Sequence, residues 1–482
     1  MNTPVRKVAL ACMVLFAALL VNANWIQVGQ VDRLKTEPTN ARQITERLER
    51  QRGGIISGDT QLAISVPVDD EYKFQRQYPA GQLYANVTGY YTLFTAAGLE
   101  RSEDVFLSGD DDRLLASRVT DLFTGEERRG GTVVTTIVPR LQQVAAEALG
   151  DRTGAVVALD PATGAILAMV TSPTYDPNTL ATHDESAATE AYQALAGAES
   201  QPLLNRPAQQ TYPPGSTFKL ITAAAALAAG YEPETRVPAP DELTLPQSTT
   251  VLPNFGGETC GDGRTDTLIH ALTISCNTAF AELGIELGGD VLRNQAEAFG
   301  FDSTIEDFPL QQARSIFPDG LDGAQTAQSA IGQFNVRATP LQMAEVAAAI
   351  GNGGVRMKPY LVSELQGPDL KRLSRTEPAE LGRPVTPEVA AKLTTMMQSV
   401  VSSGSGRRAQ ISGVDVAGKT GTAEHGAGEA PHAWFVGFAP ASSPRVAVAV
   451  IVEDGGGELG TGGAVAAPVA QKVMQAALDT QR

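Results

Sequence analysis

Near the middle of the sequence lies the stretch Tyr212-Pro213-Pro214-Gly215-Ser216-Thr217-Phe218-Lys219, which continues as an apolar run to Gly230. Two prolines and a glycine end any preceding helix, so the pattern predicts that Ser216 starts a new one. The new helix has apolar residues on every side, which is typical of a helix buried in the core. We therefore expect a serine hydroxyl at the N-terminus of a core helix, where free backbone N–H groups point.

Ser216 and Lys219 are spaced so that both side chains lie on one face of that helix, a turn apart. A serine becomes a useful nucleophile when a base within hydrogen-bond reach takes its proton. A lysine is such a base only when it is neutral, which burial and a second nearby cation favour by lowering its pKa. A capping serine followed by a lysine that extends to solvent fits the same residues, so this motif alone leaves both interpretations open.

Two further motifs favour the catalytic interpretation. Ser275-Cys276-Asn277 lies in a region of helical pattern, and Lys419-Thr420-Gly421-Thr422 ends a run with the pattern of a strand. The first offers a hydroxyl and an amide, and the second a cation and two hydroxyls that suit a carboxylate. Gly421 would let a peptide substrate approach the edge of its strand closely. Chance is a poor explanation for Ser-x-x-Lys, Ser-x-Asn and Lys-Thr-Gly in this order.

The sequence around these motifs predicts an α+β fold. Residues 155–160 and 165–170 read as a β-hairpin, and residues 172–214, with their six prolines, read as an irregular segment. Helical patterns recur over residues 268–287, 339–350, 387–401 and 467–478, and strand patterns over residues 414–422, 433–439 and 446–452. A hairpin, a block of helices, three strands and a last helix indicate an antiparallel sheet surrounded by helices.

The part before residue 150 has a different texture. Residues 42–52 carry charges at helical spacing, which predicts a surface helix, and residues 53–131 read as the short strands and turns of a small mixed domain. A better helix pattern covers residues 140–149. Glu103-Asp104-Val105-Phe106 resembles the opening of a glycosyltransferase motif, but no His-x-Gly follows, so an ordinary loop is the better interpretation.

The N-terminus predicts export. Arg6 and Lys7 precede an apolar run over residues 8–21, and Trp25 follows soon after. The uninterrupted run is shorter than the roughly 20 residues that span a bilayer, so a membrane anchor and a cleaved signal peptide compete. Trp25 suits a membrane interface and favours the anchor. In both cases the basic flank stays in the cytoplasm and the rest of the chain lies outside it.

Charge and composition exclude several classes of function. The 482 residues include 54 acidic and 37 basic side chains, giving a net charge of −17, which would repel a nucleic acid. Three cysteines and four scattered histidines form no recognisable zinc motif, so we expect neither a metal site nor a cofactor. Export makes a disulfide between Cys260 and Cys276 plausible, worth up to ~3 kcal/mol. Two buried free thiols are the alternative.

Longer stretches around the motifs resemble the class B penicillin-binding proteins, and most closely their short actinobacterial form. The similarity covers residues 151–482 and looser matches precede it at Arg52-Gly53-Gly54-Ile55 and Gly98-Leu99-Glu100. The stretches that carry it are Gly154-Ala155-Val156-Val157-Ala158-Leu159-Asp160, Tyr212-Pro213-Pro214-Gly215-Ser216-Thr217-Phe218-Lys219, Ala338-Thr339-Pro340-Leu341-Gln342-Met343-Ala344, Ala417-Gly418-Lys419-Thr420-Gly421-Thr422-Ala423-Glu424 and Ala433-Trp434-Phe435-Val436-Gly437.

The resemblance implies a membrane-anchored peptidoglycan D,D-transpeptidase that cross-links stem peptides and is acylated by β-lactams. It implies a penicilloyl-serine transferase fold, with a five-stranded antiparallel sheet and a helical subdomain, over residues 151–482. A small mixed pedestal domain over residues 29–150 and a cytoplasmic tail with a transmembrane helix over residues 1–28 would precede it. The catalytic domain would be extracytoplasmic, on a single-pass anchor, with partners among the proteins of cell division or cell-wall synthesis.

The resemblance also implies the roles of the motif residues. Ser216 attacks the bond between the two terminal D-alanines of a stem peptide and Lys219 accepts its proton. Ser275 passes the proton to the leaving D-alanine, with electrostatic support from Lys419. Asn277 binds the peptide amide of the substrate.

The remaining implied roles fall on the Lys-Thr-Gly strand. Thr420 and Thr422 are placed for the terminal carboxylate, beside Gly421. The N–H groups of Ser216 and Thr422 form the oxyanion hole.

One departure from the family and two competing functions stand beside this hypothesis. Cys276 is unusual within the Ser-x-Asn motif, and a bond to Cys260 would tether the loop that carries Ser275. A hydrolase of the same fold, either a carboxypeptidase or a β-lactamase, is one alternative, although we can assign no carboxylate that activates a deacylating water. A sensor without catalysis is the other, but only a few residues precede Val8 for a cytoplasmic output.

Overall fold

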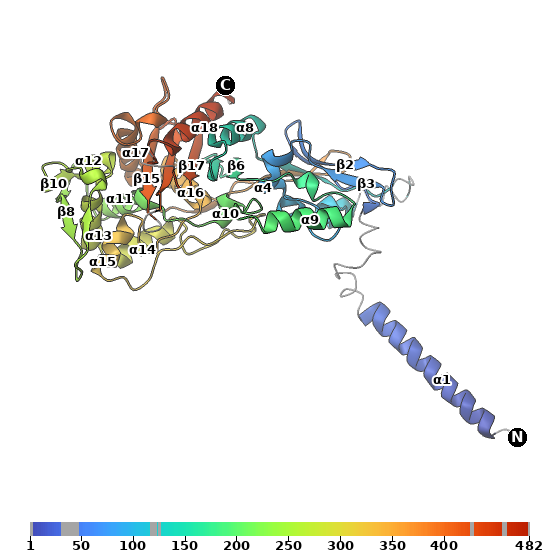
Figure 1. Ribbon diagram of the computed structural model, residues 1–482. Helices are drawn as coiled ribbons and strands as arrows, with labels where there is room; N and C mark the ends of the chain where they lie inside the picture. The colour runs from blue at the N-terminus through green and yellow to red at the C-terminus, as the bar shows by residue number, and fades with distance from the viewer. Residues whose placement is uncertain are drawn as a thin grey trace.

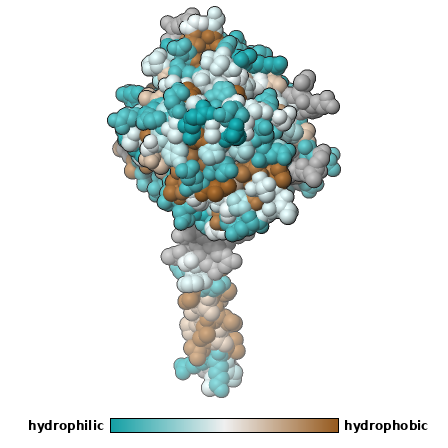
Figure 2. All heavy atoms as spheres, turned by 90° about the vertical axis from the view of Figure 1, so that its left-hand side faces the viewer, coloured by the Kyte–Doolittle hydropathy of each residue, from teal (hydrophilic) through white to brown (hydrophobic). Residues whose placement is uncertain are grey.

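A computed structural model describes residues 3–29, 48–115, 123, 127–424, 429–455 and 460–480. At its N-terminus, helix α1 (Thr3–Asn24) ends in a π-helical turn, η1 (Trp25–Gly29), and none of the α1 residues is buried. An 18-residue window of this 22-residue helix has a mean hydropathy of 2.0, so the helix is long and apolar enough to cross a bilayer. Figure 2 shows apolar side chains along it. Most of the surface helix expected over residues 42–52 lies outside the described residues.

The predicted antiparallel sheet is present and has five strands, in the order β15-β16-β17-β5-β6 (Figure 1). The hairpin expected after residue 154 supplies two of them, and every residue of the three inner strands β16, β17 and β5 is buried, so both faces are covered. The fold class is thereby confirmed. The strands are β5 (Gly154–Leu159), β6 (Ile166–Ser172), β15 (Ala417–Ala423), β16 (His432–Ala439) and β17 (Val446–Val452).

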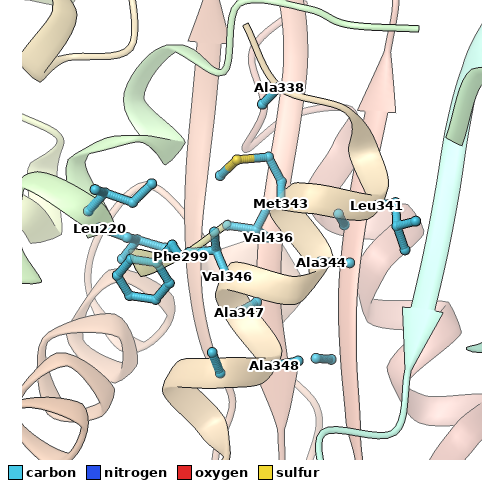
Figure 3. Close-up of a cluster of buried hydrophobic side chains, with 14 of the residues drawn as sticks. Leu220, Phe299, Ala338, Leu341, Met343, Ala344, Val346, Ala347, Ala348 and Val436 are labelled. Carbon is cyan, nitrogen blue, oxygen red and sulfur yellow. The ribbon is translucent and has the colours of Figure 1, made fainter. Parts of the chain in front are cut away.

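Helices pack on both faces of this sheet. The amphipathic helices α8 (Pro139–Leu149) and α18 (Ala466–Thr480) cover one face, and the largely apolar α16 (Pro340–Gly351) covers the other. Figure 3 shows Val346 of α16 beside Leu220 and Phe299, with Val436 of β16 behind it. Because α16 separates the sheet from the helical block, its residues from Pro340 to Ile350 are all buried.

The helical block surrounds the helix that was expected to start at Ser216. Ser216 lies in a single 3-10 turn, η5 (Gly215–Thr217), and the α-helix proper, α11 (Lys219–Ala228), begins at Lys219. Every α11 residue from Lys219 to Leu227 is buried, as its apolar composition predicts. The other helices of the block are α12 (Leu268–Ile274), α13 (Asn277–Leu287), α14 (Gly289–Ala298), α15 (Gly323–Ala330), α17 (Pro387–Ser402) and η7 (Arg407–Ala409).

Two expectations for this part were wrong. The single helix expected over residues 268–287 is broken, because Ser275 adopts a left-handed conformation (φ 67°) at the end of α12 and Cys276 starts the next helix. The segment over residues 172–214 is not wholly irregular. It contains η4 (Pro177–Thr179), the helix α9 (Glu185–Ala196), which Asp184 caps, and α10 (Arg206–Gln209).

The pedestal is built on a six-stranded mixed sheet, in the order β13-β12-β4-β1-β2-β3. Two of its strands come from beyond residue 360, and Leu365 of β12 pairs with Val133 of β4. The expected division at residue 150 therefore does not separate the two sheets. The strands are β1 (Ile55–Ser57), β2 (Thr60–Pro67), β3 (Phe74–Gln77), β4 (Thr132–Thr135), β12 (Val362–Gln366) and β13 (Arg372–Arg375).

Short helices and strand pairs complete the fold. The loop expected over residues 103–106 was wrong, because most of it forms a short helix. The pedestal helices are η2 (Gly81–Tyr84), α4 (Ala85–Thr88), α5 (Gly98–Ser102), α6 (Asp104–Leu107) and η3 (Asp112–Leu114). The two-stranded pairs are β7 (Arg236–Pro238) with β10 (Thr265–Thr267), β8 (Glu242–Thr244) with β9 (Val251–Pro253), and β11 (Arg356–Met357) with β14 (Glu380–Gly382), and η6 (Phe255–Gly257) follows β9.

Candidate active site

The turn that carries Ser216 is held from three sides. Gly215 has a φ of 51° and its N–H donates to Gly332 O at 3.0 Å. A Cβ on Gly215 would lie 2.8 Å from Thr422 O, so the turn touches the end of strand β15. From behind, the Trp434 indole N–H donates to Pro213 O at 3.0 Å. The position of Ser216 relative to the Lys-Thr-Gly strand is therefore fixed by backbone contacts.

Lys219 is fully buried beneath this turn. Its Nζ donates to Ser275 O at 2.7 Å and to Asn277 Oδ1 at 2.8 Å, and Ser275 Oγ lies 3.4 Å away. Burial, and secondarily the charge of Lys419, hold the pKa of Lys219 well below its usual value. Within the described part of the chain no hydrogen bond joins Ser216 to Lys219. A neutral amine has two N–H groups and one lone pair, so the two short bonds leave the lone pair free for a proton.

Lys419 approaches Ser275 from the opposite side. Its Nζ donates to Ser275 Oγ at 2.9 Å and to Thr420 O at 2.8 Å. Burial lowers its pKa to about 7. The Ser275 hydroxyl thus lies between two buried amines whose pKa values are both lowered, which favours proton exchange among the three groups.

The break between α12 and α13 positions Ser275 and Asn277. The side chain of Asn254 caps α13, because its Oδ1 accepts from the N–H groups of Asn277 at 2.9 Å and Thr278 at 3.1 Å. Asn254 is almost fully buried, and its amide nitrogen has no hydrogen-bond partner among the described residues. We did not find this residue from the sequence, since an asparagine 23 positions before the helix it caps leaves no local signal.

Cys260 and Cys276 form a disulfide in this structure. The bond joins Cys260, in the segment after η6, to Cys276, which lies between Ser275 and Asn277 where α12 and α13 are separated. Cys12 is free and lies in α1.

A cleft of about 570 Å³ opens over these groups. Five of the predicted catalytic and substrate-binding residues line it: Ser216, Ser275, Asn277, Thr420 and Thr422. Both lysines lie beneath its wall and are fully buried. The only charged side chains among the described lining residues are the carboxylates of Glu258 and Glu424.

Gly421 packs against the turn that carries Ser216. A Cβ at this position would lie 3.0 Å from Pro214 O and from Thr217 Cγ2. The missing side chain therefore lets β15 lie against the Ser216 turn. Because β15 is an edge strand of the sheet, alternate backbone N–H and C=O groups on its outer side have no partner strand in the described part of the chain.

Among the described residues, no cluster of three or more His, Cys, Asp and Glu side chains could hold a metal ion. The cleft offers one partly buried serine, a hydroxyl shared by two buried amines, and the edge of strand β15. This set suits acyl transfer through a covalent serine intermediate.

Two family models match the chain. The penicillin binding protein transpeptidase domain matches residues 154–475, and the penicillin binding protein A dimerisation domain matches residues 52–133. Among curated proteins, the chain is 49% identical to the peptidoglycan D,D-transpeptidase PbpA of Mycolicibacterium smegmatis and 48% identical to that of Mycobacterium tuberculosis. Both similarities cover 99% of this chain and 99% of the relative.

Solved structures agree with these relatives. The ceftriaxone acyl-enzyme complex of penicillin-binding protein A from M. tuberculosis superposes with a TM-score of 0.87 at 49% identity, over 90% of this chain and 100% of that one. The penicillin G acyl-enzyme complex of the same protein gives a TM-score of 0.86 at 49% identity, over 89% of this chain and 100% of that one.

Proposed function

The chain belongs to the penicillin-binding protein transpeptidase family and is a peptidoglycan D,D-transpeptidase, and we propose that its acyl-enzyme forms on Ser216. The observation that carries this assignment is the Ser275 hydroxyl, which two buried amines contact at the floor of the cleft beside Ser216. β-Lactams acylate the same serine, because they bind where the D-alanyl-D-alanine end of the stem peptide binds.

In the first step, neutral Lys219 takes the proton of Ser216 Oγ on its free lone pair. The oxygen then attacks the carbonyl carbon between the two terminal D-alanines, and a tetrahedral intermediate forms. Its negative oxygen is stabilised by the N–H groups of Ser216 and Thr422, the second of which belongs to the edge strand β15.

In the second step, the C–N bond breaks and the leaving D-alanine needs a proton on its nitrogen. Ser275 supplies it, and the hydroxyl regains a proton from Lys219 through the contact at 3.4 Å. Lys419, at 2.9 Å from the same oxygen, stabilises the negative charge that develops there. An amine of a neighbouring stem peptide then attacks the acyl-enzyme by the reverse sequence and forms the cross-link.

Substrate binding uses the two walls of the cleft. Asn277 binds the peptide amide of the donor, and Thr420 and Thr422 bind its terminal carboxylate. The buried charge of Lys419 behind Thr420 adds an attraction for that carboxylate.

Intact mass after treatment with benzylpenicillin tests the assignment of Ser216. We expect one long-lived adduct on the unmodified chain, mapped to the peptide that contains Ser216, and no adduct on Ser216→Ala. Circular dichroism of the variant checks that it is folded. An adduct that persists in Ser216→Ala would reject the assignment, and an adduct that disappears rapidly would indicate a β-lactamase.

The transpeptidase is distinguished from a carboxypeptidase by its acceptor. With a stem-peptide donor and an added amine, we expect the amide product, whereas hydrolysis alone would indicate a carboxypeptidase.

We further propose the arrangement of the chain at the membrane. The N-terminal apolar helix is consistent with a single-pass anchor. A cytoplasmic tail and anchor would cover residues 1–28, a pedestal residues 29–150, with its sheet completed by strands β12 and β13, and an extracytoplasmic transpeptidase domain residues 151–482. Protease added to spheroplasts should digest the catalytic domain and leave a small protected fragment that contains α1. An intact catalytic domain after that treatment would contradict this topology.

We also propose that partner proteins of cell division or cell-wall synthesis bind the anchored chain. Crosslinking in cells should capture such proteins with the full chain more strongly than with a secreted form that begins at residue 29. Equal capture would show that the anchor is not needed.

A further inference from the structure

A hydroxyl outside the three motifs touches the Lys-Thr-Gly strand. Ser405 Oγ lies 2.6 Å from Thr420 Oγ1, and both residues line the cleft. Ser405 follows the end of α17 and is exposed, whereas Thr420 is 5% exposed. The two hydroxyl groups therefore lie on the same wall of the cleft, one on the exposed segment after α17 and the other on the buried strand β15.

The chain around Ser405 is fixed in place by close backbone contacts. Ser405 N donates to Thr273 O at 3.2 Å. A Cβ on Gly404 would collide with Thr273 O, and a Cβ on Gly463 would collide with Ser405 O. Two glycines thus allow this segment to pack between neighbouring backbones, which holds the Ser405 hydroxyl against Thr420.

The two hydroxyl groups cannot both donate a proton within this contact. Two hydroxyl groups carry two protons, and only one of them can lie between the two oxygens. The other proton must point elsewhere. If Ser405 donates to Thr420 Oγ1, the O–H of Thr420 is left to turn into the cleft, and accepting that bond makes it a stronger donor.

The direction of the Thr420 O–H matters because of the charges that line the cleft. No Lys or Arg side chain is among the described lining residues, and the acidic ones, Glu258 and Glu424, would repel a carboxylate. Lys419 is close but buried, and its Nζ bonds are to Ser275 Oγ and Thr420 O. A carboxylate on this wall must therefore be bound mainly by hydroxyl donors, whose direction becomes decisive.

We propose that Ser405 is a positioning residue for the substrate's terminal carboxylate. By donating to Thr420 Oγ1 it directs the Thr420 O–H toward that carboxylate. This inference rests on the proposed role of Thr420 in substrate binding.

The test compares two acylating agents that differ only in that carboxylate, benzylpenicillin and its methyl ester. Second-order acylation rates are measured on the full chain for Ser405→Ala, for Ser405→Thr, which keeps the hydroxyl, and for Ser405→Cys, a weaker donor of similar size. Ser403→Ala is the matched control, because its hydroxyl lies in the same segment but bonds to Ser399 O and lines no part of the cleft.

We expect Ser405→Ala to acylate about tenfold more slowly with benzylpenicillin and at an almost unchanged rate with the ester. The acid-to-ester ratio should fall in Ser405→Cys too, and remain that of the unmodified chain in Ser405→Thr and Ser403→Ala. A variant that is only less well folded would be acylated more slowly by benzylpenicillin and by its methyl ester, by the same factor. An unchanged ratio in both Ser405→Ala and Ser405→Cys would overturn the inference while leaving Ser216 acylation intact, whereas failure of the proposed function would appear as no Ser216-dependent acylation of the unmodified chain.

Discussion

Lys219 and Lys419 share one acceptor, the hydroxyl oxygen of Ser275, at 3.4 and 2.9 Å respectively. Burial lowers the pKa of both lysines, and the positive charge of Lys419 lowers the pKa of Lys219 further. The two lysines therefore have different roles. Lys219 is the group kept neutral as a base, and the charge of Lys419 is part of what keeps it so.

The first prediction concerns the pH dependence of acylation. The rate should rise with pH as Lys219 loses its proton, since only the neutral amine accepts the proton of Ser216. Lys419→Met removes a nearby positive charge, so the pKa of Lys219 should rise and the ascending limb should move to higher pH. Measuring the rate of benzylpenicillin acylation from pH 5 to 9 gives the pH at which the rate rises.

Lys419→Arg is the control for that shift, because its charge is retained at every pH used. Its rate should fall, since the guanidinium does not fit the site of the amine, but its limb should not move upward. A limb at the same pH in Lys419→Met as in the unmodified chain would contradict the coupling of the two lysines.

The second prediction concerns the disulfide between Cys260 and Cys276. Reduction releases the tether on the break that carries Ser275, so acylation by a fluorescent penicillin should become several-fold slower in reductant. The loss of the cross-link should also lower stability by up to ~3 kcal/mol, seen as a lower Tm. Cys260→Ser with Cys276→Ser should acylate at the reduced rate with or without reductant. Equal rates for the oxidised and reduced chain would rule out the link.

Local patterns in the sequence were sufficient for the core of the catalytic region and for its motifs. Three stretches encode their own structure through prolines, glycines or an unbroken apolar sequence. They are the apolar run after Ser216, the hairpin near residue 160 and the strand that contains Lys419-Thr420-Gly421. The burial of two lysines close together beneath the cleft could also be expected from elementary electrostatics. Burial and a neighbouring cation both lower the pKa of a lysine, as a lysine base requires.

The features that sequence reasoning missed depend on contacts between distant segments. Ser275 adopts its left-handed conformation where Asn254 and a disulfide hold the next helix, and no residue near Ser275 signals a break. The strand β12 joins the pedestal sheet because β4, about 230 residues earlier, offers it a free edge. The contact of Ser405 with Thr420 likewise exists only once α17 has packed on β15.

The third prediction concerns the pedestal. Glu100 is fully buried and pairs with Arg52 Nε at 2.7 Å and Arg76 Nε at 2.5 Å. Glu100→Ala leaves two buried guanidinium groups without this partner, so the free energy of unfolding should fall by roughly 3–5 kcal/mol. Urea denaturation measures the loss. Acylation of the folded protein at low temperature should be unchanged, because the cleft lies on the other sheet.

Glu127→Ala is the matched control for that variant. Glu127 pairs with Lys73 at 2.8 Å on the surface, where both side chains are more than half exposed. Removing such a pair should change the free energy of unfolding by less than about 1 kcal/mol. A loss as small in Glu100→Ala would show that the buried ion pairs do not stabilise the pedestal.

The last prediction separates helix capping from catalysis at Asn254. Asn254→Ala deprives the N–H groups of Asn277 and Thr278 of their acceptor, so stability should fall by about 1–2 kcal/mol and acylation should slow as Asn277 and Ser275 lose their fixed positions. Asn254→Asp keeps the accepting oxygen, and the helix N-terminus favours its negative charge, so most of the acylation rate should return. Asp184→Ala provides the comparison, because Asp184 caps α9 through the same two-bond arrangement, at 3.0 Å to both Ser186 N and Ala187 N, away from the residues that line the cleft. That variant should lose similar stability and acylate normally. Equal acylation by Asn254→Ala and Asp184→Ala would show that Asn254 supports the helix and not the catalytic site.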